Sequence, residues 1–166
     1  LDLAQMTSAT AVIGGVGSDK IVGFAGADSL DGGEGKDTLV LNSSSTDLNR
    51  ATDLQLKNIE VIDASGSTSG VLLNLGAQND GFQVEGGDYA DTITGSLGRD
   101  ALKGGDGNDT FVGFVAADSL EGGAGSDTLV LNSSSADLDA AGDLDLKGIE
   151  IIDASNSTSG ISLSLS

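Results

Sequence analysis

Apolar and polar positions follow a nine-residue pattern in two stretches of the chain, residues 14–40 and 86–130. Each nine-residue block begins with glycine, has aspartate at its sixth position and has a large apolar residue at its eighth. The eighth-position residues are Ile21, Leu30, Leu39, Ile93, Leu102, Phe111, Leu120 and Leu129. A period of nine is too short for a pair of helices and suits one short strand with one tight turn. The pattern therefore predicts an all-β chain of short, regularly repeated strands.

Two blocks together predict one coil of a flattened parallel roll. In this interpretation the eighth-position side chain points inward and stacks on its equivalents in the neighbouring coils. The glycines permit positive φ and a close approach of the backbone in the turns. Turns that are eighteen residues apart then lie on the same edge of the roll, about 4.8 Å from one another.

A second, longer repeat overlies the blocks, because residues 27–75 recur at 117–165 with most residues identical. The chain therefore divides into two units, which we expect to form one continuous solenoid. The first unit has three blocks and the second has five, a difference of one whole coil. The units are residues 1–75, with nonapeptides at 14–40 and wider coils at 41–75, and residues 76–166, with nonapeptides at 86–130 and wider coils at 131–166.

The stretch between the two nonapeptide runs has apolar clusters at the spacing of short strands. We interpret it as wider coils that continue the same solenoid, with a short helical turn at residues 47–52. A small separate β-sandwich between two rolls is the alternative interpretation. The expected strands are residues 39–41, 54–56, 59–62, 71–75 and 82–84.

The sixth-position aspartates are the candidate metal ligands. Carboxylates about 5 Å apart on successive coils repel by about 1 kcal/mol in water, and by more at a lower effective dielectric constant. A hard cation between the turns removes this repulsion, and calcium accepts six to eight oxygen ligands in flexible geometry. The absence of His and Cys argues against zinc. The alternative for each aspartate is that it caps a turn without binding metal.

Blocks with two leading glycines alternate with blocks that have lost the second glycine. We therefore expect a calcium ladder on one edge of the roll and a partly apolar opposite edge. Tyr89 replaces a turn glycine and weakens the site at Asp91, while Ala116 weakens a second-edge pair of Asp100 with Asp118. The expected ligands are Asp19, Asp37, Asp91, Asp109 and Asp127 with Gly15, Gly17, Gly33, Gly35, Gly87, Gly105, Gly107, Gly123 and Gly125, and then Asp100 and Asp118.

The blocks match the pattern GGxGxDxUx, where U is a large apolar residue, and so the chain resembles the RTX family of secreted bacterial proteins. This resemblance implies a calcium-loaded parallel β-roll and export by type I secretion to an extracellular location, such as the bacterial cell surface. In that family such rolls occur in toxins, proteases, lipases, adhesins and surface-layer proteins. The fold class we expect is all-β, a right-handed parallel β-roll or β-solenoid, with about three to four calcium ions in its turns.

Composition narrows the functions further. The chain has 26 acidic and 7 basic residues and a formal net charge of −19, which argues against binding to nucleic acid or to an anionic membrane. No apolar stretch is long enough to span a membrane, and without cysteine the chain has no disulfides. The serine triplets at 43–45 and 133–135 have no histidine base, so we expect solvated turns and no enzyme activity.

The expected function is that of a calcium-dependent structural repeat region in a large secreted or cell-surface bacterial protein, of adhesin or S-layer type. The duplicated long unit favours this interpretation over a single compact roll attached to an enzyme. The alternative is the folding and secretion module of a type I-secreted enzyme or toxin, whose catalytic domain lies outside this fragment. The expected partners are calcium ions and neighbouring repeats of the same protein, and the interpretation allows self-association at the cell surface.

Overall fold

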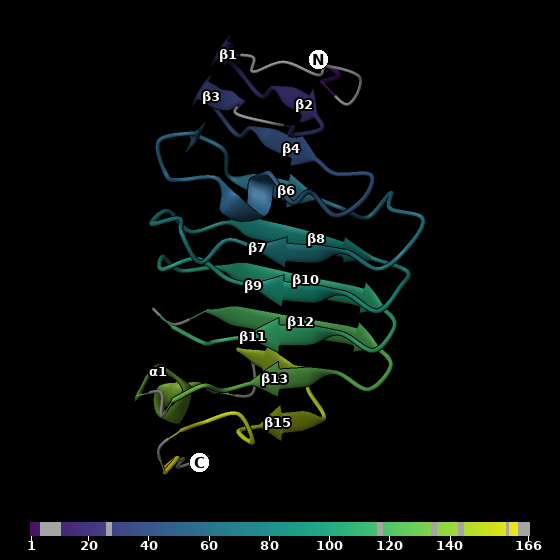
Figure 1. The fold of residues 1–166 in the computed structure, drawn as a ribbon, viewed down its shortest axis with the longest axis vertical. Coiled ribbons are helices and arrows are strands. Elements are labelled where there is room, and N and C mark those ends of the chain that lie inside the picture. The colour runs from purple at the N-terminus through teal and green to yellow at the C-terminus, as the bar shows by residue number, and fades with distance from the viewer. Residues whose placement is uncertain are drawn as a thin grey trace.

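The computed structural model describes residues 1–3, 11–25, 28–115, 118–133, 136–142, 145–158 and 160–162. This part of the chain consists of short parallel strands stacked along one axis, as Figure 1 shows. Even-numbered strands form a seven-stranded sheet, and odd-numbered strands form the opposite wall. The seven-stranded sheet contains β2 (Lys20–Val22), β4 (Thr38–Val40), β6 (Val61–Asp63), β8 (Gln83–Gly87), β10 (Ala101–Asp106), β12 (Ser119–Ala124) and β14 (Leu146–Lys147).

The opposite wall is divided into two sheets. A three-stranded sheet contains β1 (Ala11–Val16), β3 (Ser29–Glu34) and β5 (Leu56–Lys57). A five-stranded sheet contains β7 (Leu72–Asn74), β9 (Thr92–Thr94), β11 (Thr110–Val112), β13 (Thr128–Val130) and β15 (Ile151–Asp153). In Figure 1 the five-stranded sheet points left in front and the seven-stranded sheet points right behind it, while the chain descends. The winding is right-handed, and the all-β parallel solenoid predicted from the sequence is confirmed.

Two short helices lie in the widened loops of the described chain. The predicted helical turn is a 3₁₀ helix, η1 (Leu48–Arg50), whose first N–H is capped by Ser45 Oγ at 3.1 Å. Its counterpart in the second unit is α1 (Ala136–Ala140). Residues 134 and 135 of the second serine triplet lie outside the described residues. Neither described helix has the length and apolar character needed to cross a membrane.

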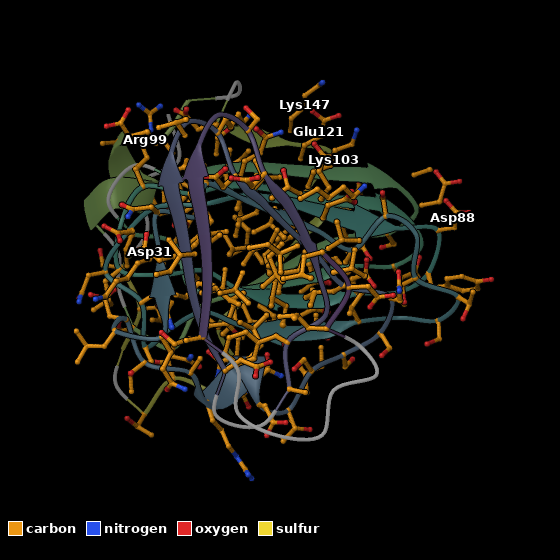
Figure 2. The ribbon with its side chains drawn as sticks, turned by 90° about the horizontal axis from the view of Figure 1, so that it is seen from above. Asp31, Asp88, Arg99, Lys103, Glu121 and Lys147 are labelled. Atoms are coloured by element: carbon orange, nitrogen blue, oxygen red, sulfur yellow. The ribbon has the colours of Figure 1, made fainter. Side chains whose placement is uncertain are left out.

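The eighteen-residue coil is confirmed by the strand register. Leu102 pairs with Leu120 and Phe111 with Leu129, each eighteen residues along the chain. The eighth-position side chains are all at most 2% exposed and belong to one apolar cluster between the walls. Figure 2, seen along the solenoid, shows this filled interior with Asp88 and Arg99 at its two edges. A stacked column of apolar side chains therefore takes the place of a conventional globular core.

The coils between the two nonapeptide runs are wider. Thr38 of β4 pairs with Val61 of β6, 23 residues later, and Val61 pairs in turn with Gln83 of β8, 22 residues later. Because β6 joins its neighbours in one sheet, the alternative of a separate β-sandwich is wrong. The strand expected at residues 54–56 is also largely wrong, since only its last residue is in a strand and Leu54 is 73% exposed.

The widened coils move the nonapeptide turns from one edge to the other. Residues 17–19 precede β2 and so lie at the amino ends of the seven-stranded sheet, whereas residues 88–91 follow β8 and lie at its carboxyl ends. All strands of this sheet are parallel, so the ladder expected on a single edge is split between two edges. The physical reason is that the 54 residues from Gly32 to Gly86 would make three coils of eighteen, but make two and a half wider ones.

Candidate metal sites

Each predicted pair of stacked aspartates is joined by a hydrogen bond between coils. The backbone N–H of Asp19 donates to Oδ1 of Asp37 at 2.7 Å on the amino-end edge. On the carboxyl-end edge, Asp109 receives the N–H of Asp91 and donates its own to Asp127, at 2.7 and 2.8 Å. These bonds form because each aspartate directly precedes a strand whose register with the next coil is eighteen residues. One carboxylate oxygen of Asp37, of Asp109 and of Asp127 therefore satisfies a backbone donor of the preceding coil.

The second carboxylate oxygen separates the aspartates into two groups. In the first group this oxygen is buried and has no hydrogen-bond partner among the described residues. A buried carboxylate oxygen without a partner is costly in free energy, so a ligand that coordinates it stabilises the fold. The members of this group are Asp19, Asp37, Asp109 and Asp127, each through its Oδ2 atom.

The turns of this first group share one backbone conformation, with positive φ at the second and fourth positions of the block. The residues concerned are Gly15, Gly17, Gly33, Gly35, Gly105, Gly107, Gly123 and Gly125. The turns also stack closely, because a methyl group on Gly125 would overlap the carbonyl oxygen of Gly107. Glycine is thus required both for its backbone freedom and for this approach, which places backbone carbonyls near the carboxylates.

The second group of aspartates has its second oxygen occupied by a backbone N–H. Oδ2 of Asp91 accepts from Gly87 at 2.9 Å, and neither that glycine nor Gly86 has positive φ. Tyr89 stands where the other turns have their fourth-position glycine, so this turn takes a different conformation. The candidate ligand Asp91 therefore has the arrangement of a turn cap in this structure.

The alternate blocks show the same capped arrangement. Oδ2 of Asp100 accepts from Ser96 N–H at 2.6 Å, and Oδ2 of Asp118 accepts from Val115 N–H at 2.9 Å. Asp100 also donates its own N–H to Asp118 at 2.9 Å, so the predicted pair is stacked. Ala116, which we expected to weaken this pair, lies outside the described residues. The structure favours turn capping for these two aspartates.

Burial and neighbouring charge act on the protonation of the central carboxylates. Burial raises the pKa of Asp109 to about 6, and the negative charges of Asp91, Asp127 and Asp106 add to the rise against the hydrogen bond from Asp91. Burial also raises the pKa of Asp91, although hydrogen bonds from Val71 and Gly87 oppose it. A cation bound between the stacked carboxylates would lower these pKa values by supplying the opposite charge.

The donor set fits calcium. No three acidic, histidine or cysteine side chains converge in the part of the chain that the structure describes, so carboxylates are offered in pairs from successive coils. Backbone carbonyls of the glycine turns would complete an all-oxygen shell, which a hard cation such as calcium prefers. A bound calcium ion would supply positive charge to the unpaired Oδ2 atoms and so hold adjacent coils together.

Two acidic residues outside the nonapeptides extend the same pattern and were missed by the sequence analysis. Glu60 Oε2 accepts the N–H of Asp37, and Glu150 Oε2 accepts the N–H of Asp127, both at 2.8 Å. The sequence signal for these residues is an acidic side chain two positions before an apolar one, repeated 90 residues later. Glu60 and Glu150 each stand where a nonapeptide block would have its sixth-position aspartate, but the residues before them lack the two leading glycines.

The fold and these turns define a parallel β-solenoid that offers stacked oxygen ligands to cations along both edges. Residues 11–39, 85–113 and 115–134 match the family model described as RTX calcium-binding nonapeptide repeat (4 copies). The chain therefore contains RTX calcium-binding nonapeptide repeats, and such repeats bind calcium. No curated protein and no solved structure matched the chain.

Proposed function

We propose that this chain is a structural segment, folded by calcium outside the cell, of a large secreted or cell-surface bacterial protein of the adhesin or S-layer type. The observation that carries the proposal is the set of four buried Oδ2 atoms without hydrogen-bond partners among the described residues. A chain with a net charge of −19 and these unpaired carboxylates gains stability from divalent cations that bind only the folded state.

The arrangement of the acidic residues supports a structural role over a catalytic one. The carboxylates recur at equivalent positions of successive coils, as the bonds of Asp91, Asp109 and Asp127 illustrate. A catalytic site needs a distinct constellation of acid, base and nucleophile, whereas a repeated ladder distributes stabilisation along a rod. The extracellular location and self-association at the cell surface are parts of the proposal that rest on the family resemblance.

The test is a calcium titration of folding. The chelator-stripped chain is expected to be largely disordered by circular dichroism and to acquire a β spectrum as calcium is added, with a midpoint of about 0.1–1 mM, the range of extracellular modules. Magnesium at the same concentration is the control, since it prefers a rigid octahedral shell and loses water reluctantly. A complete β spectrum in chelator, or a midpoint below about 1 μM, would contradict calcium-driven folding outside the cell.

The folding and secretion module of a type I-secreted enzyme or toxin would give the same titration. The wide coils between the nonapeptide runs favour the structural segment, because β6 links both runs into one continuous sheet. Sequencing the gene on both sides of this chain separates the two functions. Further copies of the long unit support the structural segment, and an adjacent catalytic domain supports the secreted enzyme.

A further inference from the structure

Glu60 occupies the position, one coil beyond Asp37, where the next stacked aspartate after Asp19 and Asp37 would lie. It lies directly before β6, as Asp37 lies directly before β4, and the two strands pair in register. The Asp37 N–H donates to Glu60 Oε2 at 2.8 Å, whereas the Asp19 N–H donates to Asp37 Oδ1 at 2.7 Å. The longer glutamate side chain thus reproduces the contact made by an aspartate one coil earlier.

The turn before Glu60 also reproduces the oxygen-rich environment of a nonapeptide turn. Asn58 has a φ of 50° and is the single non-glycine residue with positive φ in the described chain. Its carbonyl oxygen lies against Gly32, where an added methyl group would overlap it. A backbone carbonyl and the Glu60 carboxylate therefore both lie beside the turn that contains Asp37.

The second unit contains the same arrangement 90 residues later. Glu150 Oε2 accepts the N–H of Asp127 at 2.8 Å. Gly148, the counterpart of Asn58, has a φ of 63°, and its carbonyl oxygen lies against Gly122. The two copies lie on opposite edges of the seven-stranded sheet, so each one extends a different row of stacked aspartates.

The aspartate that contacts each glutamate has an unpaired buried oxygen close to a carbonyl of the glutamate-containing turn. A methyl group on Gly32 would meet both Asp37 Oδ2 and the Asn58 carbonyl, and one on Gly122 would meet both Asp127 Oδ2 and the Gly148 carbonyl. Asp37 and Asp127 are both fully buried, and their Oδ2 atoms have no hydrogen-bond partner among the described residues. By contrast, Asp91 and Asp100 have this oxygen satisfied by a backbone N–H. The unpaired oxygens thus occur in the two aspartates that donate their N–H to a glutamate, Asp37 and Asp127, as well as in Asp19 and Asp109.

We propose that Glu60 and Glu150 are metal ligands, and that each ladder has one calcium site beyond its last nonapeptide. The pairs Asp19–Asp37 and Asp37–Glu60 then hold calcium on one edge, and Asp109–Asp127 and Asp127–Glu150 on the other, which makes two sites per edge and four in all. Both glutamates lie outside the residues that match the family model. The inference rests on calcium binding by the repeats and adds two sites to it.

The test counts bound calcium in the 166-residue chain by native mass spectrometry and isothermal titration calorimetry. Glu60→Gln and Glu150→Gln each keep an oxygen that can accept the aspartate N–H but remove the charge. We expect four ions for the unsubstituted chain, three for each single variant and two for the double variant. Glu85→Gln, the same change on the outer face of β8, is the control and should bind four.

The outcomes separate this inference from the proposed function. If the unsubstituted chain binds no calcium, the proposed function fails. A count of two in the unsubstituted chain, or a count that neither substitution lowers, overturns the glutamate sites alone. Circular dichroism in calcium identifies any variant that does not fold. The calcium count of such a variant is set aside, and the count of the unsubstituted chain, four or two, then tests the glutamate sites.

Discussion

The backbone N–H of Asp91 donates to Oδ1 of Asp109 at 2.7 Å, across the eighteen residues of one coil. The same contact joins Asp109 to Asp127 in the following coil. Each carboxylate therefore has two tasks, since one oxygen fixes the backbone of the preceding coil and the other is available to a cation. Where a backbone N–H takes the second oxygen, the aspartate keeps only the structural task.

Substituting an aspartate of each kind should separate the two tasks. Asp127→Asn should lose two calcium ions, because we assign Asp127 to the pairs with Asp109 and with Glu150. Asp100→Asn should lose none, since both oxygens of Asp100 already accept hydrogen bonds. It should still lower the free energy of unfolding by about 1–3 kcal/mol through those buried bonds. Calcium counting and denaturant unfolding measure both effects, and equal calcium losses would contradict the division.

Restoring a glycine should open a further site. Tyr89→Gly permits positive φ at the fourth position of its block, as in the turns with Gly107 and Gly125. The turn can then release Oδ2 of Asp91 from the Gly87 N–H, and the count of bound calcium should rise by one. Tyr89→Ala is the matched control, because it removes the ring but still disfavours positive φ. A gain with alanine, or no gain with glycine, would show that the turn conformation does not decide this site.

Protonation of Asp109, in the row of stacked aspartates on the carboxyl-end edge, should partly replace the effect of calcium on folding. Because the folded pKa of Asp109 is raised to about 6, the folded chain binds a proton there that the unfolded chain, with an ordinary aspartate pKa near 4, releases. The stability gained from this proton is present at about pH 4 and is lost as the pH rises through 6. Calcium-stripped protein should therefore gain β structure by circular dichroism between pH 7 and 4.5.

The same proton competes with calcium for the carboxylate. At a fixed calcium concentration, the affinity of the Asp109–Asp127 pair should fall as the pH drops below 6. Asp109→Asn removes the titrating group and should flatten the pH dependence of the calcium-free spectrum. A β content that rises with pH in the calcium-free protein would have the wrong sign for a raised pKa.

The coil and its core could be predicted from the sequence because both are encoded in a strict period. Leu102 and Leu120, eighteen residues apart, pair in the structure as the block length requires. The edge of each ladder could not be predicted, because it depends on the number of half-coils between the runs. That number depends on the lengths of loops such as the one containing η1, and these lengths do not follow the nine-residue repeat.

The site residues likewise divide into those that the sequence indicated and those that it did not. Tyr89 indicated from sequence that the Asp91 site is altered, because a missing glycine excludes a specific backbone conformation. Glu60 gave only a weaker signal, an acidic residue two positions before an apolar one without the leading glycines, because its side chain reaches the Asp37 N–H through the wide coil that pairs β6 with β4. A motif defined by local spacing cannot identify a ligand that arrives through a loop of different length.

A deletion of one whole coil tests the architecture directly. Removing residues 95–112 joins Thr94 of β9 to Gly113 and deletes β10 and β11 together. β8 can then pair with β12 and β9 with β13, because both partners are displaced by the same eighteen residues. The shortened chain should fold in calcium and lose about 4.8 Å of length.

Removing half a coil should be far more damaging. Deleting residues 95–103 would send the turn that contains Asp109 to the amino-end edge and exchange the two walls for every later strand. Asp118 would replace Asp109 as the acceptor of the Asp91 N–H, so a block without paired glycines would stack on the Asp91 turn. The later glycine turns would stack on residues 75–82, which have neither the glycine pattern nor a ladder aspartate. Thermal unfolding in calcium should show a clear transition for the eighteen-residue deletion and a much lower or absent one for the nine-residue deletion. Equal unfolding temperatures would mean that eighteen residues are not the repeating coil, and the solenoid derived from that coil would be wrong.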